Sequence, residues 1–182
     1  MARAQGVQRS RPNGGQRAHV APLAGIVHNS CMDRFDTAIL TALQRDGALT
    51  NAALAERVGL SASQVSRRRA ALEAAGIIEG YSARLSASRM GHGFRAIIRV
   101  NLRGHGQGRE EEFAAFVAGQ PMIRSAFSVS GDADYILDIR ARDLESFADF
   151  VHRHLLPHPQ IAQVRSEIVL KTLKDERGVP LP

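Results

Sequence analysis

The patterned part of the chain opens with apolar residues at helical spacing. The stripe lies within residues 33–47 and consists of Phe35, Ile39, Leu40 and Leu43. Acidic residues stand in its first turn and a glycine follows its last turn, and both features favour a helix with one buried face. We therefore expect a first short helix in this segment.

Two further helices are indicated, each with a cap residue before it and a glycine after it. Thr50 precedes the second, and Gly59, which tolerates a left-handed backbone, ends it. Ser61 begins the third as an S-x-x-Q capping box with Gln64, and Gly76 ends it. Because only a tight turn separates the second and third helices, the three segments together predict a helix-turn-helix.

Residues 77–93 follow the third helix and lose its periodicity. The sequence IIEGY at residues 77–81 is β-prone and indicates a brief strand. The stretch after it contains Ser, Ala and Gly without any period, which is typical of a hinge. We therefore expect a first domain at residues 32–84 and a hinge at residues 85–93.

The second half of the chain alternates between strand and helix patterns. The order is strand, helix, strand, strand, helix, strand, which specifies a ferredoxin-like βαββαβ sheet and makes the whole chain an α+β protein. The domain should cover residues 94–175 and leave a tail at 176–182. We expect its elements at residues 94–103, 109–118, 122–130, 135–141, 143–156 and 161–173.

The patterns also predict which residues face the core. Alternation in the second strand assigns Ile123, Phe127 and Val129 to one face, and Leu144 begins the apolar face of the second helix. Residues 131–134, GDAD, should form the turn between the second and third strands.

Some strand residues predict a second apolar face on the sheet. Ile97, Ile136 and Val169 lie out of phase with the residues assigned to the helix-packed core. Two helices cover only one face of such a sheet, so the other must be polar or covered. Burial against an identical domain would give a two-fold dimer.

Composition and charge narrow the class of protein. The 182 residues are 44% hydrophobic and 23% charged, and no apolar run approaches the about 20 residues that cross a bilayer. Residues 1–31 read as a disordered basic extension, native or added upstream of Met32, without the apolar core of a secretory signal. A single cysteine, Cys31, offers neither a disulfide nor a zinc cluster. We expect a cytoplasmic protein without membrane association, metal or cofactor.

The net charge of +6 is confined to the first half of the chain. Residues 1–31 carry four Arg and no acid, and residues 32–93 carry eight Arg against six acids. Residues 94–182 carry twelve basic and twelve acidic residues. This asymmetry favours a polyanion as the partner of the first half.

The third helix has the features of a DNA recognition helix. With Val65 and Leu72 turned inward at 100° per residue, its outward arc holds Ser63, Ser66, Arg67, Ala70 and Ala74. Small side chains allow close approach to a groove. The predicted partner is double-stranded DNA.

Individual roles follow from side-chain chemistry. Gln64, Ser66 and Arg67 are the candidates for base edges, because Gln pairs with adenine and Arg with guanine. Phosphate contacts are assigned to Arg68, Arg84 and Arg89, which would fix the register without reading sequence. Ser61 and Ser63, at the start of the helix, complete the predicted DNA-binding set.

Residues 33–182 resemble the Lrp/AsnC family of feast/famine transcriptional regulators. The matching stretches are DRFDTAILTALQRDGALTNAALAERVGLS, SRRRAALEAAGIIEGY, SGDADYILDI and VLKTLK. The resemblance implies a winged-type helix-turn-helix joined to a ligand-sensing, oligomer-forming βαββαβ domain of the RAM type. It also implies a homodimer, or an octamer, that responds to a small effector such as an amino acid.

In the family, effectors bind near the turn that corresponds to GDAD, which implies contacts from Gly131, Asp132 and Asp134. Gly131 would permit close backbone approach, turn amides would hold a carboxylate, and an aspartate would meet an ammonium group. A plain polar hairpin turn is the alternative. The chain departs from the family at Arg69, usually aliphatic, and at Ala133, commonly aromatic.

Two other functions are compatible with the sequence. Sirohaem decarboxylases share both domains and would need histidines and arginines converging on a pocket, for which His92, His105, His152, His154 and His158 are the sources. Their spacing favours neither a metal site nor catalysis, so we expect no enzymatic activity. A DNA-bridging architectural protein that ignores ligands is the other alternative.

Overall fold

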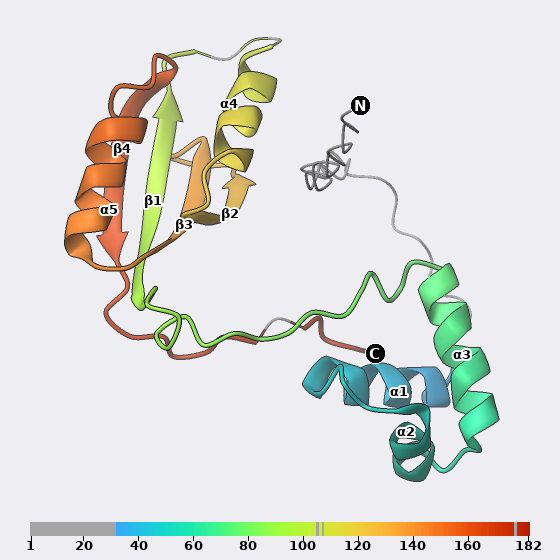
Figure 1. The fold of residues 1–182 in the computed structure, drawn as a ribbon. Coiled ribbons are helices and arrows are strands. Elements are labelled where there is room, and N and C mark those ends of the chain that lie inside the picture. Colours follow the sequence, from blue (N-terminus) through green and yellow to red (C-terminus); the bar gives the residue numbers. More distant parts are fainter. Residues whose placement is uncertain (1–31, 105, 107, 177) are drawn as a thin grey trace, which may run out of the picture.

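The structure is a computed structural model that describes residues 32–104, 106, 108–176 and 178–182. Its first domain consists of α1 (Arg34–Arg45), α2 (Asn51–Val58) and α3 (Ala62–Ala74). An extended linker joins it to a second domain (Figure 1). The basic extension expected at residues 1–31 lies outside the described residues.

Each helix of the first domain begins at a side-chain cap, and the caps of α2 and α3 are the residues that the sequence predicted. The carboxylate of Asp33 accepts hydrogen bonds from the backbone N–H groups of Phe35 (2.8 Å) and Asp36 (3.0 Å). The hydroxyl of Thr50 accepts from Ala53 N at 3.2 Å. Gly59 follows α2 with φ of 71°, a conformation that costs glycine little. Local side-chain chemistry therefore sets the helix boundaries.

The helices enclose a small core in the first domain. Ile39, Leu54 and Val65 are fully buried, one from each helix. Several partly buried side chains pack against this core, among them Ile78 from beyond α3 and Leu181 from the C-terminal tail. The apolar stripes of the three helices thus meet as predicted.

The brief strand expected at residues 77–81 is not formed. These residues form bends and irregular backbone, and no strand pairs with them in the described part of the chain. A strand needs a partner for its ladder hydrogen bonds, and β-prone residues alone do not supply one. Ile78 instead packs on the helical core.

The second domain is an antiparallel sheet with the strand order β2-β3-β1-β4. Its elements are β1 (Phe94–Leu102), α4 (Arg109–Ala118), β2 (Ile123–Ser128), β3 (Tyr135–Ala141), α5 (Leu144–Phe150), a π-helical turn (Val151–Leu155) and β4 (Ile161–Ile168). This confirms the βαββαβ order (Figure 1).

One face of the sheet forms the core with both helices. Ile98 of β1 and Leu137 of β3 are fully buried, and they pack with Phe113 of α4 and Phe147 of α5 in one cluster. Alternating strand residues and a helical stripe therefore build this core, as binary patterning requires.

Two of the core assignments are wrong. The β2–β3 register shifts between Ile123 and Ser125, so Ile123 is buried while Phe127, opposite Ile136, is 57% exposed. A bulge changes the face of every later residue in its strand, which the letters alone do not reveal. Leu144, at the start of α5, is 56% exposed and is not part of the helix's buried side.

The face opposite the helices is mixed in character. Ile97, Ile136 and Val169 are half-buried within the single chain. Ion pairs flank them, between Arg95 and Asp138 at 2.6 Å and between Arg99 and Glu167 at 3.0 Å. We refer to this side of the sheet as the open face.

The C-terminal tail returns to the first domain and contacts α1. The Gln44 side chain donates from Nε2 to Val179 O (3.2 Å) and accepts from Val179 N at Oε1 (2.7 Å). Leu181 packs against the helical core beyond this contact. A Cβ atom at Gly178 would overlap the end of the Gln44 side chain, so a larger residue there would displace this side chain from its present position. The tail therefore joins the two domains a second time.

Candidate functional sites

The third helix presents the outward arc that the sequence predicted. Val65 is fully buried and Leu72 is 5% exposed, so these two residues fix the inner side of α3. Ser63, Ser66 and Arg67 are exposed on its other side. Most of these exposed side chains are small, which leaves the helix backbone accessible to a groove.

The start of α3 is held by a reciprocal capping box. Ser61 N donates to Gln64 Oε1 at 2.9 Å, and Gln64 N donates to the Ser61 hydroxyl at 3.3 Å. The hydroxyls of Ser61 and Ser63 lie 3.1 Å apart. Gln64 thus contributes its oxygen to the cap, while its amide nitrogen is not part of the box.

Arg68 joins α3 to the start of α1. Its guanidinium contacts Asp33 and Asp36, each at 2.8 Å, and lies over the ring of Phe35. The hydrogen bonds to Asp36 and Asp33 raise the pKa of Arg68. The backbone N–H of Asp36, with smaller help from Arg68, lowers the pKa of Asp33. The sequence showed both acids at a helix start, but not that an arginine of α3, 32 residues beyond Asp36, would meet them.

Arg69 occupies the inner edge of α3 and bonds to several neighbours. Its Nε atom donates to Tyr81 at 2.8 Å and to Glu73 at 3.2 Å, and its guanidinium lies over the Tyr81 ring. Further hydrogen bonds reach Leu49 O and Asn51, both at 3.4 Å. The unusual arginine therefore ties α3 to the start of α2 and to the linker.

The remaining arginines assigned to phosphates lie outside α3. Arg84 and Arg89 are exposed on the linker. Arg84 lines a groove between the linker and the edge of the sheet, together with other arginines: Arg95, Arg124 and Arg140. The structure thus places the predicted phosphate ligands on two separate elements rather than in one cluster.

The GDAD turn is tied firmly to the sheet. Gly131 has φ of 140°, a conformation that favours glycine. The carboxylate of Asp134 accepts a hydrogen bond from Leu102 N at 2.8 Å. Asn101 Nδ2 donates to the backbone oxygen of Asp132 at 2.8 Å. The two aspartates therefore differ, since the Asp134 carboxylate holds the turn while Asp132 reaches a pocket.

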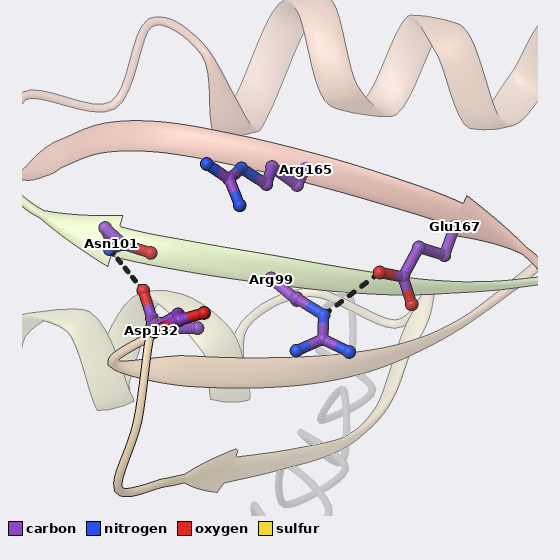
Figure 2. Close-up of a pocket in the computed structure, with 6 residues that line it drawn as sticks. Arg99, Asn101, Asp132, Arg165 and Glu167 are labelled. Carbon is purple, nitrogen blue, oxygen red and sulfur yellow. Dashed lines mark hydrogen bonds and ion pairs between the residues drawn. The ribbon is translucent and has the colours of Figure 1, made fainter.

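A pocket of about 120 Å³ lies beside the turn, on the open face (Figure 2). Its walls are Arg99, Asn101, Asp132, Ala133, Arg165 and Glu167. Ala133 is only 5% exposed, so its side chain faces the protein and leaves the mouth polar. Of these residues, sequence reasoning identified only Asp132 and the unusual Ala133, because strand register decides which other side chains join them.

Comparison with known proteins gives the family of this chain. The model of the Lrp/AsnC ligand-binding domain matches residues 95–179, and a winged helix-turn-helix DNA-binding model matches residues 32–79. The chain belongs to the Lrp/AsnC family. It is therefore a DNA-binding transcriptional regulator with a ligand-binding domain, and the resemblance inferred from the sequence is confirmed.

Individual relatives cover both domains of this Lrp/AsnC regulator. A leucine-responsive regulatory protein of Rhizobium meliloti is 41% identical over 144 residues, which are 79% of this chain and 92% of the relative. The Bkd operon transcriptional regulator of Pseudomonas aeruginosa is 33% identical over 150 residues. The match covers 82% of this chain and 98% of the relative.

A solved structure has the same two-domain arrangement. It is that of the transcriptional regulator NMB0573 of Neisseria meningitidis in complex with L-Met, with a TM-score of 0.79 and 40% identity. The match covers 82% of this chain and 97% of the Neisseria chain. The structure of an AsnC family regulator from Agrobacterium tumefaciens gives a TM-score of 0.78 at 28% identity. This match covers 82% of this chain and 97% of the Agrobacterium chain.

The histidines of this Lrp/AsnC protein lie in separate local contacts. His92 and His152 use Nδ1 toward the backbone oxygens of Met90 and Ala148, both at 2.8 Å. The rings of His154 and His158 pack against Phe150 and Phe116, respectively. His105 lies outside the described residues. The described histidines do not converge on one pocket.

No helix in the described ranges combines the length and apolar character that a bilayer crossing needs.

Proposed function

We propose that this regulator reads its operator with α3 in the major groove of DNA. The observation that carries the proposal is the exposed arc of Ser63, Ser66 and Arg67 on a helix whose inner side is sealed by Val65 and Leu72. A capped helix with small outward residues has the shape that enters a major groove.

Individual contacts divide into base edges and phosphates. Gln64 with its amide, Ser66 and Arg67 face base edges, where a bidentate pair distinguishes the correct base by about 1–3 kcal/mol. Ser61 and Ser63 lie at the N-terminal end of α3, and this end of the helix enters the groove. Arg84 and Arg89 contact phosphates, and so does Arg68, for which a phosphate competes with Asp33 and Asp36.

Selection of binding sites from randomised DNA tests this assignment. The purified protein should enrich a roughly palindromic sequence with half-sites about 10 base pairs apart or a multiple of that. Arg67→Ala should weaken binding to the selected site at least about fivefold and relax selection at one base position. The matched control is Arg153→Ala, because Arg153 is 73% exposed in the other domain and should not contact DNA. Unchanged selection by the Arg67 variant would refute the assignment.

The second part of the proposal places an amino-acid effector beside the GDAD turn. Gly131 allows the effector to approach the backbone, exposed turn amides face a carboxylate, and Asp132 meets an ammonium group. Asp134 shapes the turn through Leu102 N. The presence of L-Met in the similar Neisseria regulator supports an amino acid as the effector.

Operator affinity measured with each of the twenty L-amino acids tests the effector. At least one should change the affinity, and Asp132→Asn should reduce the response without changing affinity in the absence of ligand. If no amino acid had any effect, a ligand-independent architectural role would replace this part of the proposal.

We further propose that two copies pair through their open faces. The half-buried Ile97 and Ile136 and the 57% exposed Phe127 form apolar area that the chain's own helices do not cover. Light scattering should give twice the chain mass or a multiple of it, including an octamer, and Ile97→Asp should lower it. A monomer at high concentration would exclude this assembly.

We also propose that the protein is a cytoplasmic binding protein rather than an enzyme. The relatives named above are transcriptional regulators. The separate environments of the described histidines give no support to tetrapyrrole chemistry.

A further inference from the structure

The C-terminal tail is anchored at both of its ends. Where it leaves the sheet, Val169 N donates a hydrogen bond to Arg95 O at 3.0 Å. At the first domain, the backbone of Val179 exchanges two hydrogen bonds with the Gln44 side chain, and Leu181 packs against the helical core. The tail therefore spans the distance from the sheet to α1.

The linker connects the same two domains and is anchored on α3. The Tyr81 hydroxyl donates to Glu73 Oε1 and accepts from Arg69 Nε, both at 2.8 Å. A Cβ atom at Gly47 would lie 3.5 Å from the Tyr81 ring, so the ring packs beside the chain just after α1. The first domain is thus held on two different helices, by the linker on α3 and by the tail on α1 (Figure 1).

Between their anchors, both connections are loosely packed. Leu85 and Met90 of the linker are 74% and 61% exposed, and Leu170 and Leu173 of the tail are 94% and 88% exposed. A single segment of this kind would let the first domain turn relative to the sheet. Two segments attached to different helices restrict that rotation, because turning the domain would stretch or detach one of them.

The orientation of the first domain decides which operators two paired copies can bind. Half-sites recur on one face of DNA about every 10 base pairs, so the distance and angle between the two α3 helices select the spacing that both can reach. We propose that Gln44 and Leu181, by holding the tail on α1, set the half-site spacing of the operator. This inference rests on the proposed placement of α3 in the major groove and on the proposed pairing of two copies. Gln44 and Leu181 are positioning residues, which act through the orientation of α3 and not through contact with DNA.

Fluorescence anisotropy with operators of altered spacing tests this role in the full chain. The first probe carries two half-sites at the selected spacing, the second has about five base pairs, half a helical turn, inserted between them, and the third carries a single half-site. The spacing ratio is the affinity for the first probe divided by that for the second. For the wild type it should be at least about a hundredfold, because only the first probe lets both copies bind at once.

Leu181→Ser should reduce the spacing ratio to below about tenfold while leaving the affinity for the single half-site unchanged. Part of the reduction should come from tighter binding to the second probe, because a released first domain can turn to reach the displaced half-site. A loss of folded protein cannot produce that gain in affinity.

Two further variants complete the test. Leu173→Ser is the matched control, because it makes the same substitution at an exposed position of the same tail, and it should keep the wild-type spacing ratio. Gln44→Ala removes both hydrogen bonds to Val179 and should lower the ratio as Leu181→Ser does. Thermal unfolding of each variant shows whether it is folded, and Gln44→Ala provides the measurement if Leu181→Ser is not.

The outcomes separate this inference from the proposed function. If the folded Leu181 and Gln44 variants kept the wild-type spacing ratio, or if the wild-type ratio itself were near one, the tail would not set the spacing while recognition by α3 stood. A loss of affinity that was equal on all three probes would overturn the inference too, since the tail would then only stabilise the first domain. If Arg67→Ala left the affinity for the single half-site unchanged, the placement of α3 would fail and this inference with it.

Discussion

Three consecutive arginines of α3 have three different environments. Arg67 is exposed on the outward arc, Arg68 bonds to two aspartates of the first helix, and Arg69 bonds to Tyr81 and Glu73. Because the three residues are of the same type, the sequence distinguished them only by their angular positions around the helix. The angle identified Arg67 correctly as exposed, but the partners of the other two come from distant segments.

The role of Arg69 can be separated from that of Arg67 by matched substitutions. Arg69→Met keeps helical propensity but leaves Tyr81 and Glu73 without their shared partner, so it should lower the free energy of unfolding by about 1 kcal/mol. Arg67→Met should leave stability within about 0.5 kcal/mol of wild type while reducing DNA affinity. Urea denaturation measures both. If Arg69→Met were more stable than the wild type, Arg69 would not stabilise the domain through Tyr81 and Glu73.

The charge of Asp33 predicts a pH dependence of stability. The pKa of Asp33 is lowered by the backbone N–H of Asp36 first and by Arg68 to a smaller extent. A carboxyl whose pKa is lower when folded contributes stability above its ordinary pKa of 3.8, and that contribution is lost as pH falls through the lowered value. Asp33→Asn keeps a good cap without the charge.

Urea midpoints of the wild type and of Asp33→Asn should therefore differ at pH 6. They should converge as the pH falls below 4 toward 2. A difference that stayed constant over this range would show that the carboxylate charge contributes nothing.

At the scale of elements, the sequence predicted most helices and strands because their signals are local. Caps at Asp33, Thr50 and Ser61 and alternation in β1 depend on residues a few positions apart. The strand expected at residues 77–81 failed because its partner would have had to come from elsewhere in the chain. Phe127 was misplaced because a bulge changed the phase within β2.

The capping box of α3 should matter for both stability and DNA binding. Ser61→Ala removes the acceptor for Gln64 N and should destabilise the protein by about 1 kcal/mol. Ser61→Asp restores a cap acceptor and should recover the stability, but it places a negative charge near DNA and should not recover affinity. Thermal unfolding and anisotropy of a labelled operator measure the two effects. Recovery of affinity together with stability in Ser61→Asp would contradict a groove contact at this end of α3.

At the scale of the whole molecule, the pocket beside the GDAD turn depends on contacts that no local pattern shows. Arg99 and Arg165 become neighbours through the register of β1 with β4, and the turn joins them through Asn101. The sequence predicted the turn and its Asp132, because a family motif marks them. The arginines stayed unassigned because their positions within strands are ordinary.

The return of the tail to α1 makes a further prediction about the whole chain. Gln44→Ala removes both hydrogen bonds to Val179 and should free the tail, so trypsin should cleave after Lys171 and Lys174 several times faster. Gln163→Ala, at an exposed position of β4, is the control and should leave the cleavage rate unchanged. Equal rates for the two variants would show that the contact does not hold the tail.

Site-directed cross-linking measures the position of α3 on DNA directly. Cys31→Ser removes the single natural cysteine, after which Ser66→Cys or the exposed Ala162→Cys carries one photoreactive group. If α3 lies in the major groove, position 66 should cross-link to bases of the selected operator and position 162 should give no cross-link. Cross-links from position 162 with none from position 66 would contradict this placement of α3.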